Sequence, residues 1–407
     1  MAHAEAAPGA SPWVLQTVAK LSVAIAVILS AFVQSEPAPY EIYMAGLIGT
    51  WFLFGLRLTR TSGLLLALLM CFNLGGLLSL TVVDRIHTDL TLYVAVSLFL
   101  ALSAVFFAAV IEADHTRLRV IFGAYILGAL TAASIGILAY FGIMPSSESF
   151  IRYGRAMGTF QDPNVFGPFL ILPACYLLHR LLTAGFAAAL PRIIALSVLT
   201  LAIFLAFSRA AWALYGLSIV LLVFLLLLKE RSAAFRLRIL VLSLVGIGML
   251  VVTLVVALQF EQVSQLFEIR AQITQEYDTG QSGRFDRYTS GLLKAMENPL
   301  GIGPMSFGIL FGEDPHNIWL KALMAYGWLG FLSLLTLVVW TMAAGFKCLL
   351  RDRPWQPYFL CTYIVFFGHV LISTFVDTDH WRHLFILLGI LWGCIGLEHD
   401  TMRRNRM

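Results

Sequence analysis

The sequence predicts an all-α, polytopic membrane protein with about twelve transmembrane helices. Of its 407 residues 59% are hydrophobic and only 12% charged, whereas a soluble domain is nearer half apolar and a quarter charged. The apolar residues form runs of about 18–25, the length that a helix needs to cross roughly 30 Å of hydrocarbon. Because these runs do not alternate, they exclude a closed β-barrel, the other structure that spans a membrane.

Twelve apolar segments predict the helices in chain order. They lie at 13–33, 40–58, 62–83, 90–112, 118–142, 164–184, 190–207, 210–228, 236–259, 316–346, 356–375 and 383–398. Helices one to nine thus occupy residues 1–259, a large loop 260–315, and the last three helices with a cytoplasmic tail 316–407. We expect these parts to form a single membrane domain.

The Lys and Arg residues predict the orientation, because cytoplasmic connections carry an excess of them. With the N-terminus inside, most of the basic residues outside the helices fall on the cytoplasmic side, among them Arg57, Arg117, Lys229, Arg351 and Arg403. Both termini are therefore expected in the cytoplasm and the 260–315 loop on the outer side. The net charge of +4 reflects this bias and gives no reason to expect a nucleic-acid partner.

Polar residues gather in three outer pieces: the 143–163 loop with Arg152 and Arg155, the tight Ser208-Arg209 turn, and the 260–315 loop. Within the long loop, Gly283 to Asn298 predicts an amphipathic helix along the membrane–water boundary. Its apolar stripe is Phe285, Tyr288, Leu292 and Met296. Arg284 and Arg287 are three residues apart and lie on a neighbouring face.

These arginines suit a phosphate ligand, because a guanidinium offers bidentate donors and keeps its charge. The alternative is that they extend to ordinary anionic lipid at the membrane surface. Arg209 is the strongest of the group, since a charge in a short turn between two apolar helices is costly without a partner.

His316 lies where the long loop meets the tenth apolar segment, in Asp314-Pro315-His316-Asn317. Asp and Pro predict an N-cap and a first helical position here, as they do at Asp162-Pro163. A helix N-terminus disfavours imidazolium, so a neutral His316 could act as a general base toward an alcohol, oriented by Glu313 or Asp314. The alternative is a histidine that only hydrogen-bonds its own loop.

A last outer cluster runs from Asp377 to His383. Asp379, His380 and Arg382 could line an acceptor site, or the segment could be a polar turn with Trp381 as an interfacial anchor. The spacing of its acids and histidines matches no specific ligand pattern, and the five cysteines all lie in or at the ends of apolar segments. We therefore expect neither a metal site nor a disulfide framework.

At these residues the chain resembles the O-antigen ligase and polymerase superfamily, membrane glycosyltransferases of bacterial envelope polysaccharides. The strongest match is His316-Asn317 followed, after nine residues, by Gly327-Trp328-Leu329-Gly330. Supporting matches are Gly158-Thr159-Phe160 leading to Pro163-Asn164, Ser208-Arg209, and the run from Arg287 through Asn298-Pro299 to Gly301-Ile302-Gly303. One departure is that Leu214 lies five residues after Arg209, where some ligases have an Arg-x3-Leu pattern.

The resemblance implies transfer of a glycan, with inversion and without metal or other cofactor, from undecaprenyl diphosphate at the periplasmic face of the bacterial inner membrane. In that reaction His316 takes the proton of the acceptor hydroxyl. Arg209, with Arg284 or Arg287, meets the charge that grows on the diphosphate. Arg152, Arg155 and Asn164 are candidates for holding the donor or its sugar.

Three functions stay open on the sequence. An O-antigen ligase would transfer finished glycan to lipid A–core, and a polymerase would add it to a second lipid-linked glycan; the histidine pattern favours the ligase. A transporter of lipid-linked sugar is the third. It is disfavoured because polar residues collect on one face rather than near the membrane midplane.

Overall fold

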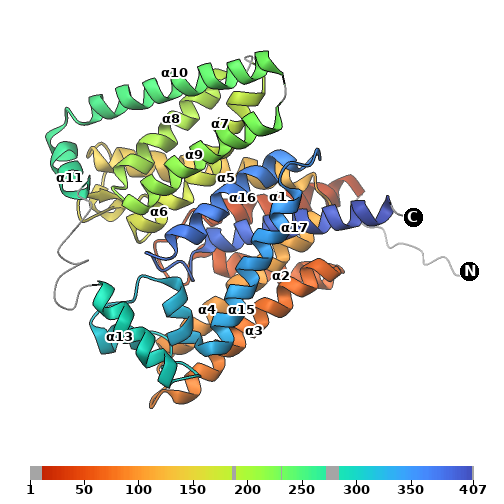
Figure 1. Cartoon of the computed structure of the whole chain (residues 1–407), viewed down its shortest axis with the longest axis vertical. Coiled ribbons are helices and arrows are strands. Elements are labelled where there is room, and N and C mark those ends of the chain that lie inside the picture. The colour runs from red at the N-terminus through yellow and green to blue at the C-terminus, as the bar shows by residue number, and fades with distance from the viewer. Residues whose placement is uncertain (1–11, 186–188, 231, 272–283, 406–407) are drawn as a thin grey trace, which may run out of the picture.

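The computed structural model describes residues 12–185, 189–230, 232–271 and 284–405, and in this part of the chain nearly all regular structure is helical (Figure 1). The helices of the first half are α1 (Pro12–Leu29), α2 (Pro39–Leu53), α3 (Arg60–Ser79), α4 (Thr88–Ala113), α5 (Arg117–Tyr140), α6 (Pro163–Phe169), α7 (Ile171–Thr183) and α8 (Ala189–Leu205). Those of the second half are α9 (Arg209–Lys229), α10 (Ala233–Ala257), α11 (Glu261–Ala271), α13 (Arg284–Glu297), α14 (Ser306–Phe311), α15 (Ile318–Cys348), α16 (Gln356–Ile372) and α17 (Arg382–Arg404).

Four short elements complete the description. Leu80–Val82 and Ser147–Phe150 are 3₁₀ helices. Strands β1 (Ile151–Arg152) and β2 (Arg155–Ala156) pair antiparallel, with Ile151 opposite Ala156.

All twelve predicted segments are helical, which confirms the all-α class. In the described chain eight helical segments are long and apolar enough to cross a membrane: Arg60–Val82, Thr88–Ala113, Arg117–Tyr140, Pro163–Thr183, Arg209–Lys229, Ala233–Ala257, Ile318–Cys348 and Arg382–Arg404. Trp13–Leu29, Ala189–Leu205 and Gln356–Ile372 are apolar but shorter. A total of about twelve spans therefore stays a prediction.

Small residues let the central helices approach closely, as is common where helices pack inside a bilayer. A Cβ at Gly75 of α3 would lie 2.4 Å from the carbonyl oxygen of Tyr326 in α15. A Cβ at Gly389 of α17 would lie 2.7 Å from the carbonyl oxygen of Ala104 in α4. Substituting either glycine would push two helices apart.

The helices form two groups joined by α16 and α17. In Figure 1, α3, α4, α13 and α15 lie in the lower half, and α6 to α11 lie in the upper half. Helix α16 packs against α7 and α9 on one side and against α17 on the other, while α17 packs on α4. The two halves are thus parts of one bundle.

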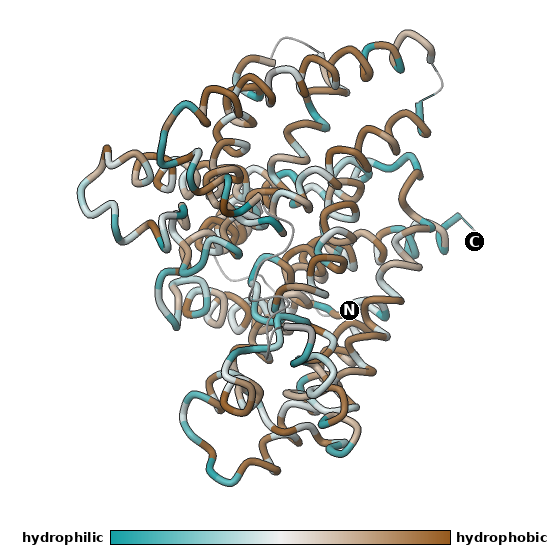
Figure 2. Tube along the Cα trace, turned by 60° about the vertical axis from the view of Figure 1, so that its left-hand side comes forward, coloured by the Kyte–Doolittle hydropathy of each residue, from teal (hydrophilic) through white to brown (hydrophobic). Residues whose placement is uncertain are grey.

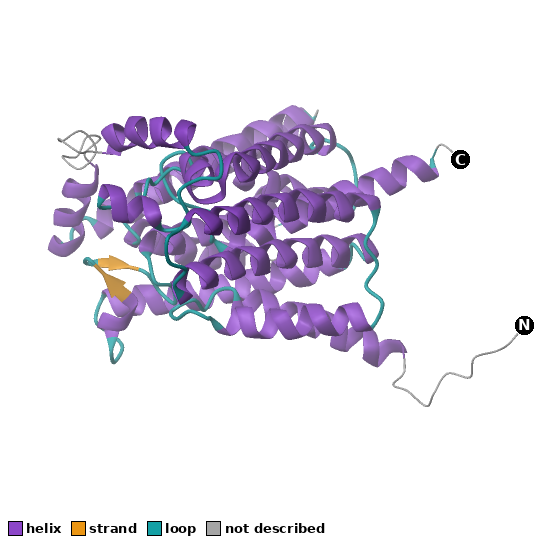
Figure 3. Cartoon of the chain, turned by 90° about the horizontal axis from the view of Figure 1, so that it is seen from below, coloured by secondary structure: helices purple, strands orange, loops and turns teal. Residues whose placement is uncertain are grey.

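Polar residues concentrate at the two ends of this bundle, and apolar residues follow the lengths of the helices (Figure 2). The start of α1 and the end of α17 lie at one end, and the strand pair lies at the other (Figure 3). Near the termini, Arg353 pairs with Glu398 at 2.7 Å. At the opposite end, Arg382 pairs with Glu36 at 3.2 Å.

Candidate functional site

The site begins where the chain enters α15. The amide oxygen of Asn317 accepts hydrogen bonds from the backbone N–H groups of Trp319 and Leu320, at 3.0 and 3.1 Å. Asn317 is therefore the N-cap, and α15 begins at Ile318, two residues later than predicted. The prediction that Asp caps the helix is confirmed at Asp162, whose side chain accepts from the Asn164 N–H. It is wrong at Asp314.

His316 precedes the cap in a left-handed conformation, with φ of +49°. A non-glycine residue in this region is uncommon. The ring lies between two carboxylates from different parts of the chain. Its Nε2 is 3.0 Å from Oε1 of Glu313, and its Nδ1 is 3.7 Å from Oδ2 of Asp377. The side chain is 33% exposed, so a solute can reach it.

Glu313 connects His316 to α13. Its Oε2 accepts a hydrogen bond from Nη1 of Arg287 at 2.8 Å. Burial alone would raise the pKa of Glu313, but the hydrogen bonds from Arg287 and His316 outweigh it, and the pKa is lowered. An ionised Glu313 only accepts hydrogen bonds, so we assign the ring proton of neutral His316 to Nε2. Nδ1 then carries the lone pair. Of the two residues predicted to orient His316, Glu313 and Asp314, the structure places Glu313 against the ring.

Asp314 has another partner, Lys321 on the first turns of α15. The Nζ atom of Lys321 is 3.6 Å from Asp314, 3.6 Å from Asp377 and 3.4 Å from Asp379. We call these four residues the Lys321 cluster. The Lys321 side chain is 11% exposed and its ammonium lies over the ring of Tyr93, 5.7 Å from the centroid.

Sequence reasoning missed Lys321 as a member of the site, and it placed Asp377 in the outer cluster without connecting it to His316. A lysine inside an apolar helix is a signal in itself, because such residues usually pair and serve a function. Two of its three partners could not be predicted, since Asp377 and Asp379 are far from Lys321 in the sequence. They come together only because the connection after α16 folds over the start of α15.

Of the residues predicted to lie on the acceptor side, Asp379 belongs to the Lys321 cluster and His380 is adjacent to it. The Asp379 carboxylate accepts hydrogen bonds from the Tyr93 hydroxyl and, at 2.8 Å, from Nδ1 of His380. The other ring nitrogen of His380 is 3.0 Å from the carbonyl oxygen of Tyr93. Arg382 is buried and pairs with Glu41 and Glu36, so its contacts hold the outer connections together.

The pKa values of the two acids of this connection are shifted in opposite directions. Burial raises the pKa of Asp377, and the nearby Lys321 only partly offsets that effect. Asp379 is buried as well, which by itself raises its pKa. Lys321, His380 and Tyr93 together reverse this and hold the pKa of Asp379 well below its usual range. Asp377 is therefore the acid whose charge is least well compensated.

The remaining predicted residues lie around the start of α9. Buried Arg155 donates to the carbonyl oxygen of Ala206 at 2.9 Å and to the amide oxygen of Asn164 at 2.8 Å. Exposed Arg152 donates to the carbonyl oxygen of Gln161 at 2.9 Å. Arg209 is the half-buried first residue of α9, whose N-cap is Ser208.

Arg155 and Asn164 thus lie together, and both precede the turn that carries Arg209. The contacts of His316, by contrast, come from α13, the connection before α15 and the connection after α16. That all these residues bind one substrate stays a prediction.

The predicted amphipathic helix is present as α13, which packs on α15. Gly283 and the side chains of Arg284 and Phe285 lie outside the described part. The face toward α15 carries Gly291 and Ala295, both buried. Leu292 and Met296 of the predicted stripe are exposed, as a helix at a membrane surface requires.

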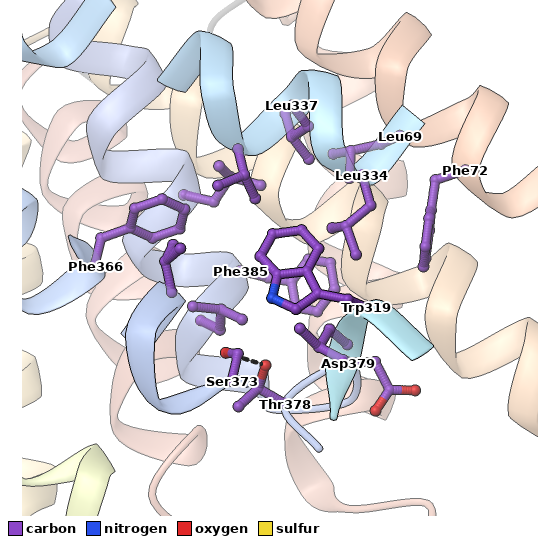
Figure 4. Close-up of a pocket in the computed structure, with 15 residues that line it drawn as sticks. Leu69, Phe72, Trp319, Leu334, Leu337, Phe366, Ser373, Thr378, Asp379 and Phe385 are labelled. Carbon is purple, nitrogen blue, oxygen red and sulfur yellow. Dashed lines mark hydrogen bonds between the residues drawn. The ribbon is translucent and has the colours of Figure 1, made fainter. Parts of the chain in front are cut away.

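An apolar cavity of about 70 Å³ lies behind the Lys321 cluster, among α3, α15, α16 and α17. Figure 4 shows the indole of Trp319 among the lining residues, with Phe366 across the opening from it. Its polar edge is formed by Asp379 and by Ser373 and Thr378, whose hydroxyls are 2.7 Å apart. The charged cluster therefore borders directly on an apolar environment.

Among the residues that the structure describes, no group of three His, Cys, Asp or Glu side chains is arranged to hold a metal ion.

Residues 194–335 match the model of a protein family described as O-antigen ligase. The predicted resemblance is thereby confirmed for this segment. The O-antigen ligase segment begins within α8, ends within α15, and includes Arg209, Arg284, Arg287 and His316. Arg152, Arg155, Asn164 and the connection after α16 lie outside it. Comparison with curated proteins gave no match.

Proposed function

We propose that this protein is an inverting, metal-independent O-antigen ligase of the bacterial inner membrane. It would transfer a glycan from undecaprenyl diphosphate to a hydroxyl of lipid A–core at the periplasmic face, with both termini in the cytoplasm. The observation that carries the proposal is the position of His316. It belongs to the O-antigen ligase segment, and its ring lies between the carboxylates of Glu313 and Asp377.

In the proposed reaction the acceptor hydroxyl approaches Nδ1 of His316, the nitrogen assigned the lone pair. At 3.7 Å, the separation of Nδ1 from Asp377 exceeds a hydrogen bond, so this nitrogen is not already engaged with Asp377. As the hydroxyl oxygen attacks the anomeric carbon, its proton passes to Nδ1. The two carboxylates beside the ring then stabilise the imidazolium that forms.

The bond that breaks is the one between the anomeric carbon and the diphosphate oxygen, and its electron pair stays on the diphosphate. Cationic groups placed before the reaction lower the barrier to such a step. Arg209 and Arg287, with Arg284, are proposed to supply them. Arg152, Arg155 and Asn164 are proposed to hold the donor glycan, and His380 and Asp379 to lie toward the acceptor.

The test is a gel of lipopolysaccharide and of lipid-linked glycan from a deletion strain that carries either the wild type or His316→Ala. Loss of a general base lowers a rate by about 10²–10⁴, so the variant is expected to lose capped lipopolysaccharide while long lipid-linked chains accumulate. The matched control is His87→Ala, because His87 is an exposed histidine at the start of a helix, α4, and its side chain makes no capping hydrogen bond.

Two results would change the proposal. If only single glycan repeats remain in the His316→Ala strain, the protein is a polymerase that uses the same chemistry on a second lipid-linked glycan. If the pattern is unchanged at normal protein level, His316 is a structural residue. Transport of lipid-linked sugar would then be the favoured function.

A further inference from the structure

We propose that Lys321 is a positioning residue for His316: it keeps Asp377 a carboxylate and so leaves Nδ1 of the ring able to accept a proton. This inference rests on the proposed function. Lys321 itself does not touch the ring, and it acts through Asp377, which is 3.6 Å from its ammonium and 3.7 Å from Nδ1.

The cluster is short of positive charge. Three carboxylates surround one ammonium, and the carboxylates of Asp377 and Asp379 are largely buried, at 13% and 4% exposure. Taking an ionised carboxylate out of water is costly, and a buried group without a cation takes up a proton instead. Asp379 has His380 and Tyr93 as further donors. Asp377 therefore depends most on Lys321.

The Asp377 side chain has one other hydrogen bond, which it accepts at 3.1 Å from the backbone N–H of Asn317. Burial already raises the pKa of Asp377 with Lys321 in place. Removing the ammonium raises that pKa further, so a proton would stay on Asp377 at higher pH. After a small movement, that proton would be donated to the lone pair of Nδ1, which lies 3.7 Å from Oδ2 of Asp377, and would block the position that the acceptor hydroxyl needs.

The other groups that face His316 would be unchanged by this substitution. Glu313 binds Nε2, Arg287 reaches the ring through Glu313, and the Tyr288 hydroxyl donates to the His316 carbonyl oxygen at 3.2 Å. Asp314 faces Lys321 rather than the ring. Because Lys321 also faces Asp379 and Asp314, a shift in pH dependence is assigned to Asp377 only when a double variant that lacks Asp377 does not show it.

The sign of the effect follows from the raised pKa. The ionised form of Asp377 is present above this pKa, and activity is lost as the pH falls through it. In Lys321→Met the acidic limb of the pH–rate profile is expected to move to higher pH by about one unit or more, with activity recovering at alkaline pH. Lys321→Arg keeps the positive charge, so the acidic limb of its pH–rate profile should lie at the same pH as in the wild type.

The experiment measures transfer by the purified full-length protein from a lipid-linked glycan across a range of pH. Lys321→Gln is a second variant, with the same expected displacement, in case the Met variant does not fold. Lys294→Met is the matched control, because Lys294 is an exposed lysine of α13 that pairs only with Glu297 in the described structure. The double variant Lys321→Met/Asp377→Ala should show no displacement.

A wild-type acidic limb in folded Lys321→Met would overturn the inference, whether the rate is unchanged or is lowered equally at every pH. That outcome is distinct from failure of the proposed function. If His316→Ala is inactive but the acidic limb of the Lys321→Met profile is not displaced, only the role of Lys321 is rejected. A fully active His316→Ala rejects the proposed function itself.

Discussion

The carboxylate of Glu313 is shared between Arg287 and His316, with one oxygen bound to each. A diphosphate that approached Arg287 would compete with Glu313 for the same guanidinium. In the proposed mechanism, donor binding would thus loosen Glu313 from Arg287 while its contact to Nε2 is retained. Arrival of the donor and orientation of the base are coupled through one side chain.

Arg209 provides the most direct test of the proposed diphosphate site. Removing one preorganised donor from a developing charge typically lowers kcat about 10²–10³-fold, so Arg209→Ala should reduce glycan transfer by that factor while the protein still inserts. Arg209→Lys should recover part of the rate, because lysine restores the charge without the bidentate geometry. The measurement is transfer by purified protein, with Arg85→Ala, an exposed arginine before α4, as control. A normal rate in folded Arg209→Ala removes Arg209 from the site.

Single residues could be predicted from the sequence where their role depends on neighbours in the chain. His316 and Glu313 are three residues apart, and their contact was expected. The cap at Asn317 was not predicted, because Asp314 is an equally good capping residue. The left-handed backbone of His316 decides between the two. Lys321 depends on Asp377 and Asp379, which no local pattern connects to it.

Helix α15 is interrupted by a kink that holds the preceding loop. Gly327 has φ of +64° and ψ of −172° within the helix. At this point the Trp328 N–H donates to the Pro299 carbonyl oxygen at 2.9 Å, and the Ile302 N–H donates to the Met324 carbonyl oxygen at 2.8 Å. The kink therefore ties the segment after α13 to α15, and with it the orientation of Arg287 toward Glu313.

Gly327→Ala should loosen this connection. A Cβ there would lie 2.7 Å from the Pro299 carbonyl oxygen, in a backbone conformation that only glycine adopts readily. We expect the free energy of unfolding to fall by on the order of 3 kcal/mol, measured as a lower Tm in detergent, together with reduced transfer. Gly216→Ala in α9 is the control, since a Cβ there meets nothing within 4 Å and alanine favours a helix. Equal Tm values for the two variants would contradict the role of the kink.

At the scale of elements, the apolar length of each segment predicted the helices, because that length is fixed by the membrane. The packing of α13 was harder to predict. Its contact with α15 uses Gly291, where a Cβ would lie 3.0 Å from the Leu320 side chain. Hydrophobicity does not mark such a residue, whereas the exposed Leu292 and Met296 dominate the pattern. The sequence therefore identified the helix and its outward face, but not the face that binds α15.

The whole molecule has one polar end with the His316 site and another with the termini. Few ionisable groups lie between them, which suits chemistry at one membrane surface rather than movement of a polar solute across it. The orientation in the membrane follows from the same division. The end with the termini carries Arg351 and Arg353, as a cytoplasmic face should, and the opposite end would face the periplasm.

Labelling of single cysteines tests this orientation. In a variant whose five native cysteines are replaced, Asp84→Cys and Glu297→Cys are expected to react in intact cells with a maleimide that cannot cross the inner membrane. Ser232→Cys and Asp400→Cys should react only after the membrane is opened, because the proposed topology puts them in the cytoplasm. All four positions are exposed, so a difference in labelling reports the side of the membrane rather than burial. The cysteine-free parent gives the background. The reverse pattern would move His316 to the cytoplasmic face, where the proposed outer-leaflet donor could not reach it.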